Sequence, residues 1–266
     1  MKRDPVYEAL KVILFMAFML MIVEISPVIS GLFTGELFEL MATAAFFGTF
    51  VLMYLVTDIF ARSEGSSIGK LGMEFDDSAV PHIIIGTIAG TIAASIVIMI
   101  AFFFGGQLRP VEQMTADLLV SEIIITAPTA VFEELAHRGY ILPHIEALAG
   151  KTPAIIISSI FFSALHFSWW AEPGFPLHLI LIFSFNIFLG GVLLSLSYYW
   201  SGRKLWVPIA FHFAWNMLAY IIFPVYPRDP VLLPEIFQIE WGITTIIGFL
   251  IGLSIIYGLL GSRKKE

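Results

Sequence analysis

The 266-residue chain has no cysteine and few charged residues, and each shortage limits what the protein can be. Without cysteine it can form no disulfide, no thiolate metal site and no catalytic thiol. Charged residues make up 13% of the chain, about half the share found in soluble domains, whereas hydrophobic residues make up 58%. A water-soluble fold of this length cannot bury so much apolar surface, so the composition predicts an integral membrane protein.

Eight apolar segments reach or approach the roughly 20 residues that a helix needs to cross a bilayer. They cover residues 12–29, 38–60, 83–104, 118–147, 153–170, 177–200, 205–223 and 239–260. Short polar connectors, several with glycine or proline, separate them. We therefore predict an all-α, polytopic membrane helix bundle with about eight transmembrane helices, in which residues 1–266 form a single membrane domain.

The basic residues divide unevenly between the two sides of this eight-span arrangement. Arg109 and Arg228 fall on one side, and the other 12 of the 14 Lys and Arg residues fall on the opposite side. The positive-inside rule makes the crowded side cytoplasmic. We expect both termini in the cytoplasm, with the protein in the cell membrane of a prokaryote or the endoplasmic reticulum of a eukaryote.

Ionisable side chains are costly at membrane depth, and the fourth segment contains the densest group of them. Glu133, Glu134, His137 and Arg138 follow directly on an apolar stretch. On a helix, Glu133 and His137 share one face, and Glu134 and Arg138 share another, because residues four apart are neighbours. One glutamate can therefore pair with Arg138 while the other faces elsewhere.

Two further segments contribute imidazoles and a carboxamide. The fifth segment contains His166, and its tight connection to the fourth segment around residues 149–150 predicts a helical hairpin with Glu133 and His166 level with each other. The seventh segment contains His212 and Asn216, which lie one helical turn apart. Counting helical rise from the cytoplasmic boundary puts His212 at a similar depth.

These functional groups suit hydrolysis of an amide at the membrane boundary. A desolvated glutamate, together with a histidine, can hold and deprotonate a water molecule. A second histidine and an asparagine can donate hydrogen bonds to the oxyanion that forms. Residue spacing alone leaves open whether these side chains meet.

Three motifs make the chain resemble the CAAX prenyl protease 2 family, also called the CAAX proteases and bacteriocin-processing enzymes. They are two glutamates, three residues and an arginine; a phenylalanine, three residues and a histidine; and a histidine, three residues and an asparagine. The matching residues are Glu133, Glu134, Arg138, Phe162, His166, His212 and Asn216. The motif region covers roughly residues 115–220, and the eight-helix layout is similar to that of the family.

The resemblance implies an intramembrane endopeptidase. Glu133 and His166 would activate water, and His212 and Asn216 would form the oxyanion site. The supporting residues would be Glu134, Arg138 and Phe162. Members of the family that process prenylated proteins remove the residues after the lipidated cysteine of a C-terminal CAAX sequence. The implied partners are the lipid bilayer and a membrane-associated, prenylated protein or peptide, and we expect no nucleic acid.

Other hypotheses stay open. We expect no cofactor and no metal, but Glu133, His137, His166 and His212 also offer a ligand set for a divalent metal ion. Alternatively, the buried acids Glu24, Glu122 and Glu133 and the histidines could form the relay of a proton- or ion-coupled transporter. The chain could also be a non-catalytic membrane scaffold or an immunity factor that keeps the fold.

Overall fold

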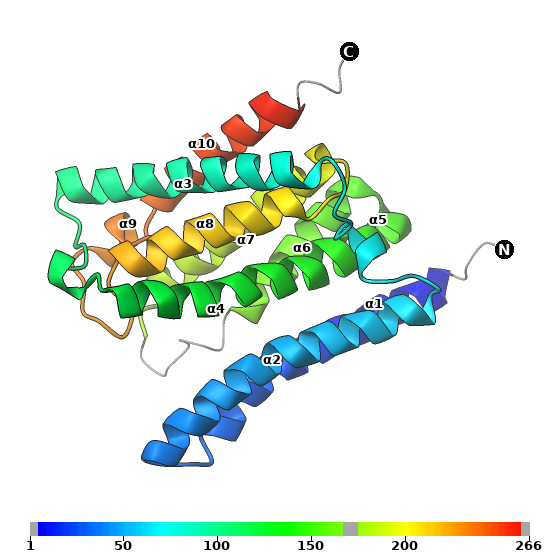
Figure 1. Ribbon diagram of the computed structural model, residues 1–266, viewed down its shortest axis with the longest axis horizontal. Coiled ribbons are helices and arrows are strands. Elements are labelled where there is room, and N and C mark those ends of the chain that lie inside the picture. The colour runs from blue at the N-terminus through cyan, green and yellow to red at the C-terminus, as the bar shows by residue number, and fades with distance from the viewer. Residues whose placement is uncertain (1–4, 167–174, 262–266) are drawn as a thin grey trace.

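The computed structural model describes residues 5–166 and 175–261, and all regular elements within these ranges are helices (Figure 1). The α-helices are α1 (Pro5–Ser30), α2 (Glu36–Ser63), α3 (Ala79–Phe104), α4 (Ala116–Glu134), α5 (Leu142–Ala149), α6 (Lys151–Leu165), α7 (Leu177–Trp200), α8 (Trp206–Ile222), α9 (Pro234–Phe237) and α10 (Thr244–Ile256). Two 3-10 turns, η1 (Gly69–Leu71) and η2 (Val111–Gln113), and two π-helices, η3 (Leu135–Ile141) and η4 (Tyr257–Gly261), complete the order.

The helices confirm the predicted all-α membrane bundle, although not every segment spans by itself. Within the described ranges, five helices have the length and apolar composition to cross a membrane: α1, α2, α3, α7, and α10 with η4. The helices α6 and α8 are shorter, with 15 and 17 residues, and α4 carries four acidic residues. Short length explains the weaker span signals of α6 and α8, which are apolar, and acidic residues explain that of α4. These three helices carry most of the predicted site residues.

Two predicted boundaries differ from the structure. The fifth segment, predicted for residues 153–170, ends as a helix at Leu165, and residues 167–170 lie outside the described ranges. The eighth segment, predicted for residues 239–260, becomes helical at Thr244. Residues 239–243 form a turn in which the carbonyl groups of Glu240 and Gly242 accept hydrogen bonds from α7 instead of continuing a helix. Apolar character alone therefore overstated the length of the helix.

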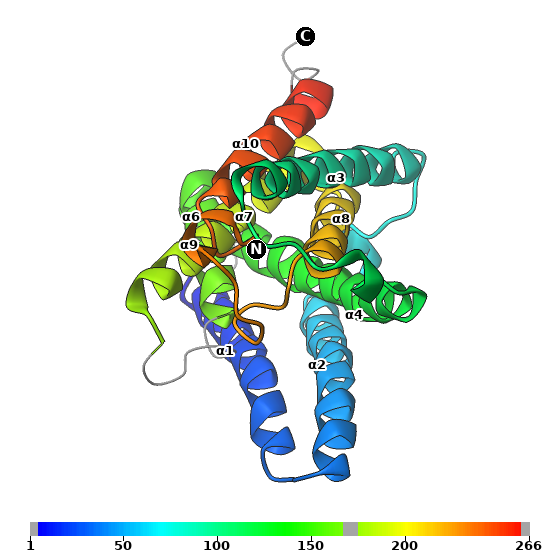
Figure 2. The same ribbon diagram turned by 90° about the vertical axis from the view of Figure 1, so that its left-hand side faces the viewer.

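Five helices of the bundle pack one against the next. Helix α10 packs on α3, α3 on α8, α8 on α4, and α4 on α2, while α7 contacts both α6 and α10 (Figure 1). In both views the α1–α2 hairpin stands apart from the other helices at its connecting turn (Figure 2). Large apolar side chains such as Ile13, Met21 and Val51 are exposed on this hairpin, as expected of a surface that faces lipid.

Small residues let α3 approach α8 closely. A Cβ atom added at Gly90 would lie 2.6 Å from the carbonyl oxygen of Phe211, and one added at Gly86 would collide with the carbonyl oxygen of Val207. Close backbone approach through small residues is a common way for membrane helices to pack. Because His212 follows Phe211 directly, this contact fixes the position of a predicted site residue.

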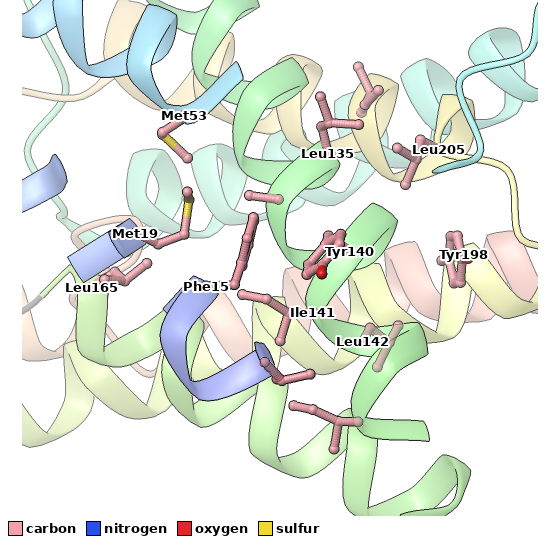
Figure 3. Close-up of a cluster of buried hydrophobic side chains, with 14 of the residues drawn as sticks. Phe15, Met19, Met53, Leu135, Tyr140, Ile141, Leu142, Leu165, Tyr198 and Leu205 are labelled. Atoms are coloured by element: carbon pink, nitrogen blue, oxygen red, sulfur yellow. The ribbon is translucent and has the colours of Figure 1, made fainter. Parts of the chain in front are cut away.

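A second packing centre surrounds the π-helix η3. Phe15 and Met19 of α1 and Met53 of α2 point toward η3 residues such as Tyr140, and the rings of Phe15 and Tyr140 lie 4.2 Å apart (Figure 3). A polar network joins the same helices, because the Glu64 carboxylate accepts hydrogen bonds from Tyr140 and His144 and pairs with Lys11 at 3.0 Å. The α1–α2 hairpin is thereby attached to the segment that follows α4.

Candidate active site

The two adjacent glutamates lie where α4 passes into η3, and the second is fully buried in an ion pair. Nη1 of Arg138 donates to Oε1 of Glu134 at 2.9 Å, and the two side chains are 1% and 0% exposed. Nη2 of Arg138 donates to the carbonyl oxygen of Gly191 at 3.0 Å. The guanidinium also lies 4.5 Å from the centre of the Phe162 ring. Glu134 is therefore a structural carboxylate with its charge neutralised, in the pairing that the sequence predicted.

His137 lies in the π-helix η3, and its side chain contacts the main chain. Nδ1 of His137 donates to the backbone carbonyl oxygen of Glu133 at 2.9 Å, not to its carboxylate. In a π-helix the backbone hydrogen bonds join residues i and i+5. Such segments often occur at functional sites. The remaining ring nitrogen of His137 is buried without a hydrogen-bond partner.

His212 of α8 bridges the two glutamates. Its Nδ1 lies 3.0 Å from Oε1 of Glu134, and its Nε2 lies 3.9 Å from Oε2 of Glu133. Because the ionised Glu134 can only accept, Nδ1 of His212 carries the hydrogen. A carboxylate that holds one ring nitrogen in this way sets the tautomer and aims the other nitrogen at the reaction site.

Glu133 has the opposite environment to its neighbour. Its side chain is 20% exposed, and its Oε2 atom is buried without a hydrogen-bond partner. Within the described ranges no Lys or Arg nitrogen comes within 4.0 Å of it, and the nearest imidazole nitrogen is Nε2 of His212. Glu133 is therefore an unneutralised carboxylate beside a neutralised one.

The sequence predicted Glu133 and His166 at the same depth on adjacent helices, and among the described residues no nitrogen of His166 lies within 4.0 Å of the Glu133 carboxylate. His166 follows the last residue of α6, and its Nδ1 donates to the carbonyl oxygen of Phe162 at 2.8 Å. The hairpin turn at Gly150 is present, but α6 packs mainly on α5 and α7 while α4 packs on α8. Glu133 consequently lies closest to His212, because η3 and α5, not α4, form the second arm of the hairpin.

His166, His212 and Asn216 line one cavity of about 60 Å³ inside the bundle. A volume of this size has room for a few water molecules. Its walls are mainly apolar and include Phe162, which lies 4.8 Å from the His166 ring and 6.2 Å from the His212 ring between centroids. The cavity places three of the four predicted catalytic side chains around one space.

The cavity also contains residues that the sequence analysis missed. Trp215 and Tyr220 of α8 and Glu240 of the turn before α10 all line it. An acid at the start of the apolar segment 239–260 was the available signal for Glu240, because ionisable groups at membrane depth are costly. Gly191, whose carbonyl oxygen binds Arg138, carried no signal, since a main-chain acceptor has no sequence signature.

The alternative metal ligands are not gathered into one group. Among the described residues, no three His, Asp or Glu side chains lie close enough together to hold a metal ion. His137 donates to a main-chain oxygen, and His212 uses Nδ1 for Glu134, so each has one remaining nitrogen.

Residues 115–218 match the family model described as type II CAAX prenyl endopeptidase Rce1-like. This segment is similar to the Rce1-like family. The match confirms the family resemblance predicted from the three motifs, and it contains all seven motif residues. A search of the curated proteins gave no match. The Rce1-like family supports an intramembrane protease of the CAAX type in general.

The Rce1-like segment runs from the N-cap of α4 into α8. Thr115 begins it by accepting a hydrogen bond from the backbone N–H of Leu118 at 3.2 Å, which caps α4. Helices α1, α2, α3 and α10 lie outside the match. Glu240 therefore belongs to the site by its position in the fold and not through the Rce1-like segment.

Proposed function

We propose that this protein is an intramembrane endopeptidase that cleaves a peptide bond near the cytoplasmic membrane face with Glu133 as the general base. The observation that carries the proposal is the contrast between two neighbouring carboxylates. Glu134 is fully buried and paired with Arg138, whereas Glu133 has no ion pair of hydrogen-bonding length and faces His212. Two acids in environments that differ so strongly commonly have different roles.

Glu133 and His166 share the activation of water in this proposal. The carboxylate takes one proton from water, the water oxygen forms a bond to the carbonyl carbon, and the carbonyl oxygen becomes the oxyanion. When the C–N bond breaks, Glu133 returns the proton to the leaving nitrogen. His166 donates through Nδ1 to a main-chain carbonyl, so its Nε2 accepts a hydrogen bond from the same water.

Asn216 stabilises the oxyanion, and so does His212 when its ring is doubly protonated, because its Nδ1 hydrogen is donated to Glu134. They lie one turn apart on α8, and both line the cavity with His166. The position of α8 is fixed by its close contact with α3 and by the hydrogen bond from His212 to Glu134. Donors that are held in place before the reaction need no reorganisation in the transition state.

The substrate class that the Rce1-like match favours is a prenylated protein with a C-terminal CAAX sequence. The mainly apolar cavity walls and the lipid-exposed hairpin also suit a substrate that is anchored in the membrane. The protein itself would stay embedded as a multi-pass protein with its termini in the cytoplasm.

Single-turnover cleavage of a membrane-anchored peptide by purified variants tests the mechanism. Glu133→Gln and His166→Ala should each lower the rate by about 10²- to 10⁴-fold, the usual contribution of general acid–base catalysis, and their effects should not add. Glu112→Gln, an exposed residue of η2, is the matched control and should cleave like the wild type. Chelation should leave the rate unchanged.

Cleavage near the wild-type rate by both Glu133→Gln and His166→Ala would refute the glutamate mechanism and favour the transporter or scaffold hypothesis. The substrate class is tested separately with a farnesylated CAAX peptide and the same peptide without the lipid. Equal cleavage of the two peptides would remove prenyl recognition from the proposal without affecting the role of Glu133.

A further inference from the structure

Glu240 lies in the turn between α9 and α10 and lines the same cavity as His166, His212 and Asn216. Its backbone is left-handed, with φ of 67°. This conformation is strained for a non-glycine residue, and such residues cluster at functional sites. The turn therefore holds Glu240 in a conformation that local preferences do not favour.

Hydrogen bonds to side chains of α7 and α10 hold the turn in place. The side-chain amide of Asn186, which is 0% exposed on α7, donates to the carbonyl oxygens of Glu240 and Gly242 at 2.8 and 3.0 Å. The backbone N–H of Glu240 donates to the hydroxyl of Thr245 at 2.8 Å. Three hydrogen bonds from two helices thus position one acidic residue at the cavity.

The groups that face the Glu240 carboxyl include no strong cation. The titratable groups around it are His212 and Tyr220 of α8, Glu133 of α4, and His166 across the cavity. The indole N–H of Trp215 lies near the carboxyl without meeting hydrogen-bond geometry. Helices α7 and α10 contribute the neutral Asn186 and Thr245.

Among the described residues, no Lys, Arg or His nitrogen lies within ion-pair distance of Glu240. A carboxyl in a mainly apolar cavity, close to a second carboxylate, favours its protonated form. A neutral carboxylic acid can donate a hydrogen bond, as enzymes with apolar oxyanion sites illustrate.

Without such a group, few hydrogen-bond donors are available at the oxyanion site. Nδ1 of His212 is used by Glu134, so Nε2 can donate only when the ring is doubly protonated. Asn216 then remains as the donor that does not depend on the protonation of a histidine. We propose that Glu240 is an additional catalytic residue, a neutral acid that donates a hydrogen bond to the oxyanion beside Asn216. This inference rests on the proposed peptidase function.

Substitutions that separate hydrogen-bond donation from charge test the inference. Glu240→Gln keeps a donor of similar size, whereas Glu240→Ala removes it. In single-turnover cleavage at pH 7, we expect Glu240→Ala to be about 10²- to 10³-fold slower, as for loss of one oxyanion donor, and Glu240→Gln to stay within about tenfold of the wild type. Glu112→Ala, far along the chain in the exposed η2 turn, serves as the control.

The pH–rate profile supplies a readout that a structural role would not change. The wild type should lose activity on its alkaline limb as Glu240 ionises and stops donating, and Glu240→Gln should lack this step. Thermal unfolding of each variant shows whether it is folded. If Glu240→Ala proves unfolded, the profile of Glu240→Gln still decides the question.

Three results would overturn the role of Glu240: wild-type cleavage by folded Glu240→Ala, equally slow cleavage by the Ala and Gln variants, or identical pH profiles for wild type and Glu240→Gln. Glu133→Gln in the same series separates the two proposals. If Glu133→Gln is inactive while Glu240→Ala is unaffected, only the inference about Glu240 fails. If Glu133→Gln cleaves normally, the proposed function itself fails.

Discussion

Replacing Glu134 by glutamine should destabilise the protein more than any other single change of its size at the site. Oε1 of Glu134 accepts from Nη1 of Arg138 at 2.9 Å and from Nδ1 of His212 at 3.0 Å. The glutamine keeps the shape but removes the charge. Arg138, which is 1% exposed, would then keep its cation buried with neutral acceptors, the glutamine Oε1 and the Gly191 carbonyl oxygen, and with no negative charge to balance it.

The expected loss follows from the burial of the pair. Removing one partner of a buried ion pair costs about 3–5 kcal/mol, because the other charge is left uncompensated. For a chain of this size, 1 kcal/mol shifts Tm by about 2–4 °C, so Tm should fall by roughly 6–20 °C. Glu133→Gln is the matched control one residue away. Glu133 has no ion pair of hydrogen-bonding length, so the Tm of the Glu133→Gln variant should differ from that of the wild type by no more than about 2 °C.

The assay is thermal unfolding in detergent, followed by tryptophan fluorescence at constant pH and detergent concentration. A double-mutant cycle with Arg138→Met adds a second test. Replacing both charged partners should lower the stability by less than the sum of the two single losses. Equal Tm values for Glu134→Gln and Glu133→Gln would refute the reasoning. Additive losses in the cycle would show that the 2.9 Å contact contributes no coupling.

Two further outcomes concern the packing around the site. Burial raises the pKa of Glu64, but its hydrogen bonds from Tyr140, His144 and Lys11 lower it to about 2, below the ordinary 4.5. The Glu64 carboxylate therefore stabilises the fold above about pH 4.5, and this contribution is lost as pH falls toward 2. The Tm difference between wild type and Glu64→Gln should shrink over that interval. A constant difference would contradict this expectation. Gly90→Val should lower Tm and slow cleavage, because the valine side chain would push α8 away from α3. Gly48→Val is the control and should do neither, because an added Cβ at Gly48 meets no atom within 4 Å. Equal effects at the two glycines would contradict this expectation.

The sequence by itself determined the class of the protein and most of its motif residues. Long apolar runs force helices, because a backbone in lipid must satisfy its own hydrogen bonds. The spacing of Glu134 and Arg138 predicted their ion pair, since residues four apart share a helix face. The three motifs also predicted the Rce1-like match, because residue types at fixed spacing along a chain are sequence information.

Only the tertiary structure decided which side chains meet. The hairpin turn predicted Glu133 and His166 at the same depth, but it did not predict that α4 packs on α8, which makes His212 the nearest imidazole to Glu133. The π-helix after Glu134 carried no sequence signal, and side chains of α1 and α2 pack around it. Glu240 enters the cavity through a turn that Asn186 holds from α7, 54 residues away along the chain. Contacts between distant segments depend on how whole helices pack, and local spacing does not encode that.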